Sequence, residues 1–346
     1  MQNGTDITNG DVSNSNKVCE TINTIFSFDN LYDAYLNSTK GVKWKYSTQN
    51  YCLNACCRIA RLYKKIQNGT YKTSKPKQFT IFERGKERNI SALTFEDRLV
   101  NKCLCDNYLN TLLTKSLIHD NGATIKGKGL SFTKKRAICH LQKYYRKYKN
   151  NGYVLKVDIH HYFESINHEI LFSQLAKKVK DEKVLEVIKD IVNSVPYGLG
   201  LGSQVSQICA IYYLNELDHY IKEKLKCKFY ARYMDDFYIL SPNYNFLVNA
   251  KSRIIKKLKS FKLKVSKNKT RIYKLKDGFV FCKTRYLLTD TGKVLRLLVS
   301  NSVKSMKRKI KLGIDIKNII PSFMAYISEF NCYKIFSFFN KYYIIS

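Results

Sequence analysis

Apolar residues recur at helical spacing near the start of the chain. Residues 26–72 carry them at every third or fourth position in FDNLYDAYLNS and YCLNACCRIARLYKKIQNG, and Gly69 follows as a stop signal. Residues 1–25 are polar and rich in Asn, Ser and Thr, which is typical of a flexible tail. The segment therefore predicts a helical region behind a polar N-terminus.

From residue 77 the spacing of apolar residues no longer follows a helical period. KQFTIFERGKERNISAL (77–93) has β-prone arms around a charged, Gly-containing tip, which predicts a hairpin. A helix is predicted over 94–117, with Thr94 able to cap it and Asp97 three residues further on. A Gly/Lys loop and a basic helix ending at Gly152 complete this half of the chain.

The second half alternates strands and helices. Residues 153–159 alternate so that Val154, Lys156 and Asp158 share one face of a strand. An amphipathic helix follows over 184–195, and then the Gly-rich loop PYGLGLGSQVSQ opens the helix ICAIYYLNELDHYIKEKL. KFYARYM and FYILS read as two strands joined by a turn. This order indicates an α+β domain with an antiparallel hairpin.

The turn of that hairpin carries two adjacent carboxylates, Asp235 and Asp236, between apolar and aromatic runs. Neighbouring carboxylates repel each other, and partial burial raises that cost. A solvated turn would explain the pair, and a bound divalent cation would also cancel the repulsion.

Charge narrows the function. Lys and Arg number 61 against 27 Asp and Glu, a net charge of +34, which favours a polyanionic partner such as nucleic acid. A membrane surface is the other common polyanion, but no apolar run approaches the roughly 18 residues of a spanning helix. The N-terminus lacks the basic and apolar regions of a signal peptide. We therefore expect a cytoplasmic protein without membrane contact.

The 11 cysteines form no CxxC pair and no CxxC…HxxxH pattern. Cys52, Cys56 and Cys57 share roughly one helical face, but no second ligand cluster lies nearby in the sequence. We interpret them as reduced thiols, with a metal site as the alternative. His160, His161 and His168 match no metal-binding spacing, so we expect structural or solvent-facing roles.

Three carboxylates can now form one site. If the strand at 153–159 neighbours the hairpin, Asp158 meets Asp235 and Asp236. Convergent carboxylates on a basic protein fit phosphoryl transfer assisted by two metal ions.

These segments resemble a known family. YARYMDDFYIL is similar to the Tyr-x-Asp-Asp motif of reverse transcriptases, and LKVDIHHYFESI is similar to their first palm motif. ERGKERNISALTFEDRLV resembles the fingers segment, KLKVSKNKT the element after the Asp pair, and GFVFCKTRYLL the palm–thumb grip. The resemblance covers roughly residues 26–330.

The loop GLGLGSQVSQ resembles the form found in diversity-generating retroelement reverse transcriptases, whereas group II intron enzymes usually have a Pro-Gln-Gly loop. Two departures stand out: Gly200 replaces a common Pro, and FVFCKT lacks the usual Gly of the grip. From the length after the expected thumb, we expect no RNase H or endonuclease domain.

The resemblance implies a right-hand polymerase with an N-terminal helical extension. The expected division is a tail (1–25), the extension (26–75), fingers (76–152), a palm (153–288, with fingers helices within 166–200) and a thumb (289–346).

The resemblance also assigns the site residues. Asp158, Asp235 and Asp236 would be catalytic and would bind two Mg²⁺ ions, or Mn²⁺. The expected nucleotide-binding residues are Lys86, Arg88, Phe163 and Gln207. Phe163 would be the steric gate beneath the sugar, and the basic pair would contact the triphosphate. The expected template or primer contacts are Arg98, Lys128, Ser206, Lys269, Lys304, Lys307 and Arg308.

Several of these residues also have structural interpretations. Phe163 could belong to the core, the hairpin tip could be solvated, and Ser206 could simply cap a helix. Arg98 could anchor the fingers. The basic residues at 304–311 could form a solvated helix face rather than follow duplex phosphates.

The implied activity is RNA-directed DNA synthesis, error-prone at template adenines, in a bacterial or phage diversity-generating retroelement. Expected partners are template RNA, the cDNA or primer, dNTPs and a small basic accessory protein. One alternative is an antiphage-defence or other group II-like bacterial reverse transcriptase of ordinary fidelity. Another is a non-catalytic RNA-binding scaffold.

Overall fold

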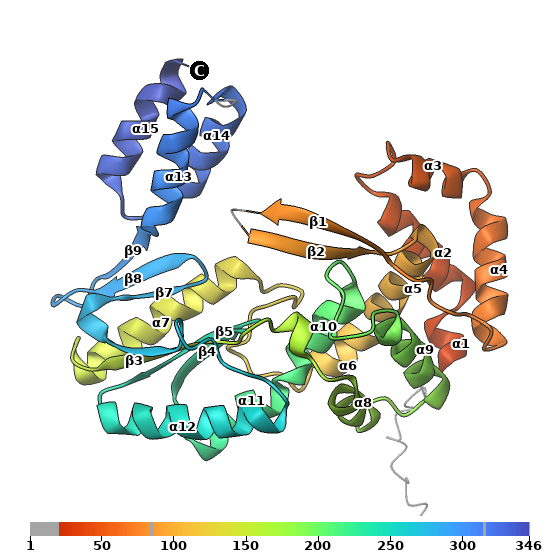
Figure 1. Cartoon of the computed structure of the whole chain (residues 1–346), viewed down its shortest axis with the longest axis horizontal. Coiled ribbons are helices and arrows are strands. Elements are labelled where there is room, and N and C mark those ends of the chain that lie inside the picture. The colour runs from red at the N-terminus through yellow and green to blue at the C-terminus, as the bar shows by residue number, and fades with distance from the viewer. Residues whose placement is uncertain (1–20, 84–85, 314–315, 346) are drawn as a thin grey trace, which may run out of the picture.

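Helices from the N-terminal region pack at one end of the molecule (Figure 1). The computed structural model describes residues 21–83, 86–313 and 316–345. The helices of this region are α1 (Ile22–Ile25), α2 (Phe28–Thr39), α3 (Tyr46–Cys52) and α4 (Ala55–Gln67). They confirm the helical prediction, and Gly69 follows α4 with a φ of +68°.

The predicted tail is too long at its C-terminal end. Residues 1–20 lie outside the described residues, but α1 is helical and buries Ile22 and Ile25. The Ile22 amide also donates to the Asp181 carboxylate at 2.9 Å. The polar composition of residues 1–25 did not indicate that Ile22 and Ile25 are buried, because the partners of this segment, such as Asp181, are distant in the sequence.

The predicted hairpin is confirmed as β1 (Lys77–Glu83) paired with β2 (Lys86–Ala92). It projects from the N-terminal helices in the direction of the C-terminal helices (Figure 1). The predicted helix 94–117 is divided into α5 (Phe95–Leu104), a π-helical segment (Cys105–Leu109) and α6 (Asn110–Thr114). Thr94 caps α5 as predicted, accepting from the Asp97 amide at 3.2 Å.

A four-stranded antiparallel sheet forms the centre, in the order β4-β5-β3-β6. Its strands are β3 (Tyr153–Asp158), β4 (Phe229–Tyr233), β5 (Asp236–Ser241) and β6 (Arg271–Lys274). The predicted strands at 153–159 and on both sides of the Asp pair are confirmed. Their alternation gives the sheet two apolar faces.

One face packs against α7 (Leu130–Tyr148), the predicted basic helix, and a second sheet. The other face packs against a layer of helices that continues into the N-terminal region. These helices are α8 (His168–Ala176), α9 (Glu182–Asn193), α10 (Gln204–Tyr213), α11 (Asn215–His219) and α12 (Tyr244–Ser260).

Helix α10 begins four residues before the predicted start at Ile208. The cap is Ser203, whose hydroxyl accepts from the Ser206 amide at 3.2 Å, so Ser206 is not the cap. The Gly-rich composition of the loop concealed this start.

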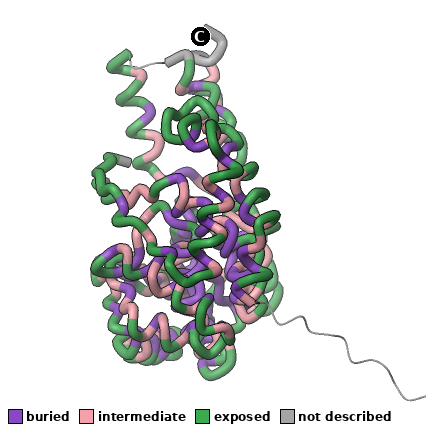
Figure 2. Tube along the Cα trace, turned by 90° about the vertical axis from the view of Figure 1, so that its right-hand side faces the viewer, coloured by how far each residue is buried: buried purple, intermediate pink, exposed green. Residues whose placement is uncertain are grey.

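The second sheet comprises β7 (Phe279–Phe281), β8 (Thr284–Leu288) and β9 (Val294–Leu298). Because β9 pairs with β8, the predicted palm–thumb boundary at 288/289 cuts through this sheet. Helices α13 (Ser300–Lys311), α14 (Ile316–Ile327) and α15 (Tyr333–Ile345) then share a core of their own. They project at one end of the chain, while the most buried segments lie in the middle (Figure 2).

Candidate active site

The two adjacent aspartates lie at a two-residue hairpin turn. Tyr233 and Asp236 pair across β4 and β5, which leaves Met234 and Asp235 as the loop. Met234 has a φ of +56°. A left-handed conformation costs a residue with a side chain roughly 1–2 kcal/mol, so neighbouring groups must hold this turn in place.

Asp158 lies directly across from this turn. Strands β3 and β5 pair in a register that places Asp158 opposite Asp236. The predicted adjacency of strand and hairpin is therefore confirmed, and it comes from pairing between segments about 80 residues apart in the chain. Directly opposed residues on neighbouring antiparallel strands have Cα atoms about 4.5–5.5 Å apart.

Two lysines contact these carboxylates. Lys156 forms an ion pair with Asp236, and the Lys269 ammonium lies 3.0 Å from the Asp158 Oδ1. Burial lowers the pKa of Lys156 to about 8. Its ammonium also lies 5.2 Å from the centroid of the Phe281 ring, which links β3 to β7. Lys269, which was predicted to contact template or primer, is therefore paired with the Asp158 carboxylate in this structure.

Asp235 has a different environment. Burial, followed by the nearby charge of Asp158, raises the pKa of Asp235. Within the described residues, no group of three His, Cys, Asp or Glu side chains is gathered closely enough to hold a metal ion. The donor chemistry nevertheless fits a hard divalent cation, because a half-buried carboxylate beside a second one gains most from added positive charge.

The Gly-rich loop packs against the predicted sugar gate. Phe163 begins a short 3₁₀ segment, and its carbonyl accepts from the Leu199 amide at 2.8 Å. Gly198 has a φ of +61°, and a Cβ there would lie 2.3 Å from the Phe163 carbonyl oxygen. Only glycine permits this close approach. The Leu201 carbonyl accepts from the Ser91 amide at 3.0 Å, so the loop also joins β2.

The first turn of α10 contains two predicted site residues. Gln207 is half-buried there. Ser206 is 5% exposed, so its side chain is part of the packed interior and is poorly placed to contact template. His168 is structural: its Nε2 lies 2.6 Å from the Gly198 carbonyl and its Nδ1 lies 3.0 Å from the Asn193 side-chain oxygen.

Two predicted template contacts lie within residues 76–152, the segment predicted to form the fingers. The Lys128 ammonium donates to the His119 carbonyl at 2.8 Å and to the Asn121 carbonyl at 3.3 Å. Lys128 therefore stabilises the loop that contains His119 and Asn121. Arg98 stacks over Phe95, and its buried Nε has no hydrogen-bond partner within the described residues.

The remaining predicted contacts lie on the hairpin and on α13. Lys86 begins β2, and its side chain lies outside the described residues. Arg88 is exposed on β2, opposite Ile81. The predicted basic face of α13 is exposed, and the Lys307 ammonium lies 4.5 Å from the Phe338 ring centroid. Lys304, Lys307 and Arg308 lie on this face.

The sequence interpretation missed a buried ion pair behind the turn. Arg232 and Asp218 are both 0% exposed, and the guanidinium makes a two-pronged contact with the carboxylate at 2.8 and 2.5 Å. An arginine inside the apolar run KFYARYM and an aspartate inside the apolar helix after the Gly-rich loop were the available signals.

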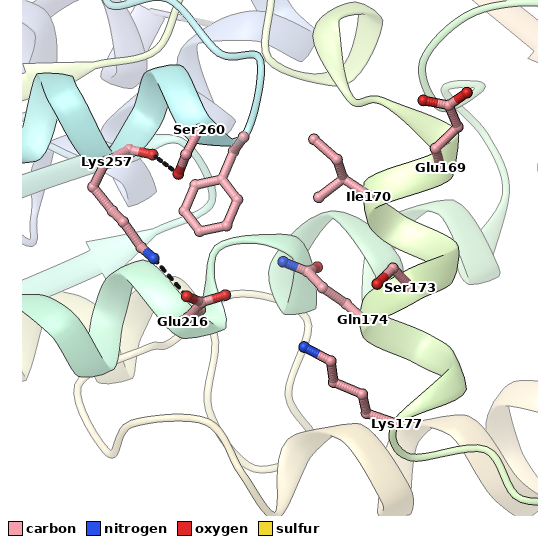
Figure 3. Close-up of a pocket in the computed structure, with 9 residues that line it drawn as sticks. Glu169, Ile170, Ser173, Gln174, Lys177, Glu216, Lys257 and Ser260 are labelled. Atoms are coloured by element: carbon pink, nitrogen blue, oxygen red, sulfur yellow. Dashed lines mark hydrogen bonds and ion pairs between the residues drawn. The ribbon is translucent and has the colours of Figure 1, made fainter.

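A surface pocket of about 350 Å³ lies elsewhere, between α8, α11 and α12 (Figure 3). Its lining includes Glu169, Lys177, Glu216 and Lys257, and the Glu216–Lys257 ion pair of 2.5 Å crosses one side. None of the three predicted catalytic aspartates lines it.

Two further observations concern the cysteines and the helices. The ten cysteines in the described part of the chain are free thiols; Cys19 lies outside it. No described helix is long and apolar enough to cross a membrane.

Comparison with known proteins identifies the class. The family described as "Reverse transcriptase (RNA-dependent DNA polymerase)" matches residues 72–309, so the chain belongs to the reverse transcriptase family. The matched region contains all three aspartates, the Gly-rich loop and most of α13.

Solved structures support the predicted right-hand polymerase fold. Telomerase from Candida albicans, solved with a TWJ fragment of telomeric RNA, has a TM-score of 0.51 and 13% identity, and covers 81% of this chain and 61% of that chain. Apo telomerase from Candida tropicalis, truncated from its C-terminal domain, has a TM-score of 0.50 and 14% identity, and covers 64% of this chain and 55% of that chain.

A curated relative matches a shorter segment. The "Uncharacterized 91 kDa protein in cob intron" of Schizosaccharomyces pombe is 33% identical over 103 residues, which is 26% of this chain and 13% of that protein. The chain thus spans only part of the length of the proteins it matches.

Proposed function

We propose that the chain is an RNA-directed DNA polymerase that extends a primer along an RNA template. The observation that carries this proposal is the β3–β5 register, which sets Asp158 opposite Asp236 with Asp235 in the adjoining turn. The reverse transcriptase family match over residues 72–309 supports the same activity.

The chemistry would divide among a few groups. Asp158, Asp235 and Asp236 would hold two divalent cations, Mg²⁺ or Mn²⁺. When bound, these cations would acidify the primer 3′-hydroxyl and stabilise the leaving pyrophosphate. Phe163 would support the incoming sugar and exclude a 2′-hydroxyl, while Lys86 and Arg88 would bind the triphosphate.

The two lysines that pair with the aspartates would have to adjust when a cation binds. Lys156 and Lys269 contact Asp236 and Asp158 in this structure. Both ammonium groups offset negative charge that a divalent cation would otherwise offset. Lys269 is near enough to Asp158 to act within the site, in addition to any contact with primer or template.

The direct test is primer extension on a defined RNA. We expect dNTP incorporation that requires Mg²⁺ or Mn²⁺ and stops on chelation. Strong RNA binding without any extension, across both metals, would instead support the non-catalytic scaffold.

We further propose that synthesis is error-prone at template adenines, as part of a diversity-generating retroelement with a small basic accessory protein. The support is the loop LGSQVSQ, which resembles that subgroup, and the packing of this loop on the Phe163 carbonyl. A shift of about 1.4 kcal/mol changes a discrimination ratio tenfold, so a small displacement near Gln207 would suffice. The preference for adenine rests on the resemblance alone.

The second candidate is a group II-like enzyme of ordinary fidelity, including an antiphage-defence role. The match to a protein encoded in an intron favours it. Sequencing of cDNA made with and without candidate accessory proteins separates the two. Substitutions concentrated opposite adenines support the retroelement role, and an even error spectrum supports the alternative.

A further inference from the structure

The catalytic turn needs support, because Met234 holds a φ of +56°. In two-residue hairpin loops, a positive φ at the first position is usually supplied by Gly, Asn or Asp. Here a methionine occupies it. The peptide between Met234 and Asp235 is the group whose rotation would release this conformation, and that rotation would also redirect the Asp235 side chain.

The Arg232 guanidinium contacts this peptide directly. Its Nη1 donates to the Met234 carbonyl at 2.9 Å, and its Nη2 donates to the Ile211 carbonyl of α10 at 3.0 Å. The same guanidinium is oriented by Asp218 of α11 through bonds of 2.8 and 2.5 Å. The Tyr230 hydroxyl donates to Asp218 at 2.5 Å and completes the cluster.

A purely structural role does not account for this arrangement. Replacing a buried ion pair by apolar residues of similar volume is often neutral or stabilising, so packing alone does not require the charges. What an apolar pair cannot do is donate to the Met234 carbonyl. The fork shape of the guanidinium lets one group bind a carboxylate and two carbonyls in a fixed geometry.

We propose that the buried Arg232–Asp218 pair positions the Met234–Asp235 peptide, and thereby sets the orientation of the Asp235 carboxylate toward the catalytic cation. This inference rests on the proposed polymerase function. Arg232 also binds helix α10 one turn beyond Gln207, so the pair joins the turn that carries Asp235 to the helix that carries Gln207. Arg232 and Asp218 are positioning residues, since both are 0% exposed and out of reach of a substrate.

The test compares three variants of the full chain. Arg232→Lys keeps the positive charge but loses the fork. The double variant Arg232→Met with Asp218→Leu removes both charges together and leaves neither unpaired. Asp97→Asn is the matched control, because Asp97 is 1% exposed and binds the Tyr71 hydroxyl at 2.8 Å, far along the chain from the turn.

Two readouts are measured. The first is the Mg²⁺ concentration for half-maximal primer extension, which we expect to rise about tenfold in both Arg232 variants, as for other residues that orient metal ligands. The second is Mn²⁺ binding to the protein without nucleotide, followed by electron paramagnetic resonance of the free ion. We expect weaker Mn²⁺ binding in the same variants, and parent values of both quantities in Asp97→Asn.

The outcomes separate the two levels of inference. If the double variant folds and shows parent values for Mg²⁺ activation and Mn²⁺ binding, the positioning role is wrong. If the double variant does not fold, parent values in Arg232→Lys lead to the same conclusion. If the parent chain shows no metal-dependent extension, the polymerase proposal fails instead, whereas altered Mn²⁺ binding would still support the positioning role.

Discussion

Half-buried Asp235, in the turn of the β4–β5 hairpin, and buried Asp120, which lies next to β4, have opposite electrostatic environments. Burial and the charge of Asp158 raise the pKa of Asp235. Burial also acts to raise the pKa of Asp120, yet hydrogen bonds and charges from His140 and Lys222 outweigh it and hold that pKa well below its usual range. Arg136 adds a further contact with Asp120 at 2.7 Å.

The difference teaches which carboxylates are available for chemistry. Asp120 and Asp218 are each paired with cationic side chains. Asp120 pairs with Arg136 and Lys222, and Asp218 pairs with Arg232 of β4, so these carboxylates connect neighbouring elements. The charge of Asp235, by contrast, is only partly offset, by Lys156 and Lys269. A carboxylate left in this condition has a reason to bind a cation, whereas a saturated one does not.

The largest effect on activity is expected at Asp235, whose negative charge is only partly offset. Asp235→Asn keeps the shape and removes a charged ligand, so primer extension should fall by orders of magnitude while RNA binding persists. Asp277→Asn removes the same charge from an exposed residue outside the site and should leave extension unchanged. Parent-level incorporation by Asp235→Asn would remove this residue from the catalytic set.

Breaking the buried Arg232–Asp218 ion pair should lower the free energy of unfolding. Asp218→Asn leaves Arg232 buried without its counter-charge, which typically costs about 3–5 kcal/mol. Urea denaturation would measure the loss. The apolar double variant of Arg232 and Asp218 should recover most of it, and equal losses in both variants would contradict this account.

The contribution of Asp120 to stability should depend on pH. Its pKa is depressed in the folded chain, so its contribution to the free energy of unfolding is present above the unfolded pKa of about 3.9 and is lost as the pH falls below it. At neutral pH, Asp120→Asn should lower the free energy of unfolding by about 1.5–3 kcal/mol. The gap between parent and variant should narrow on acidification; a constant gap down to pH 3 would count against the ion cluster.

A smaller effect is expected at the sugar gate. Phe163→Val should open space beside the incoming sugar and weaken discrimination against ribonucleotides roughly tenfold. Phe172→Val, a partly buried phenylalanine on α8, is the matched control. Competition between rNTPs and dNTPs measures the ratio, and unchanged discrimination would place the gate elsewhere.

The smallest effect concerns the exposed charges of α13. Reversing Lys304, Lys307 and Arg308 should reduce the slope of log K against log salt for RNA binding by about 2–3, because fewer counterions are released. Reversing Lys251, Lys256 and Lys259 on α12 provides a control of equal charge. Equal slopes in the two triple variants would indicate a general charge effect without a defined phosphate path.

The sequence alone determined the local elements and the faces they present. Alternation placed Lys156 and Asp158 on one face of a strand, and the apolar runs around Met234 and the Asp pair predicted the hairpin. These features depend on neighbouring residues, whose spacing matches the period of a strand or helix. The family motifs then supplied the candidate roles.

Only the tertiary structure decided which distant groups meet. The register that sets Asp158 opposite Asp236, and the contact of Arg232 with Asp218 and Ile211, join segments that are separate in the chain. It also moved the start of α10 to Gln204 and buried Ser206. Such pairings depend on how several elements fill one core together, and the period of a single segment carries no information about its partner.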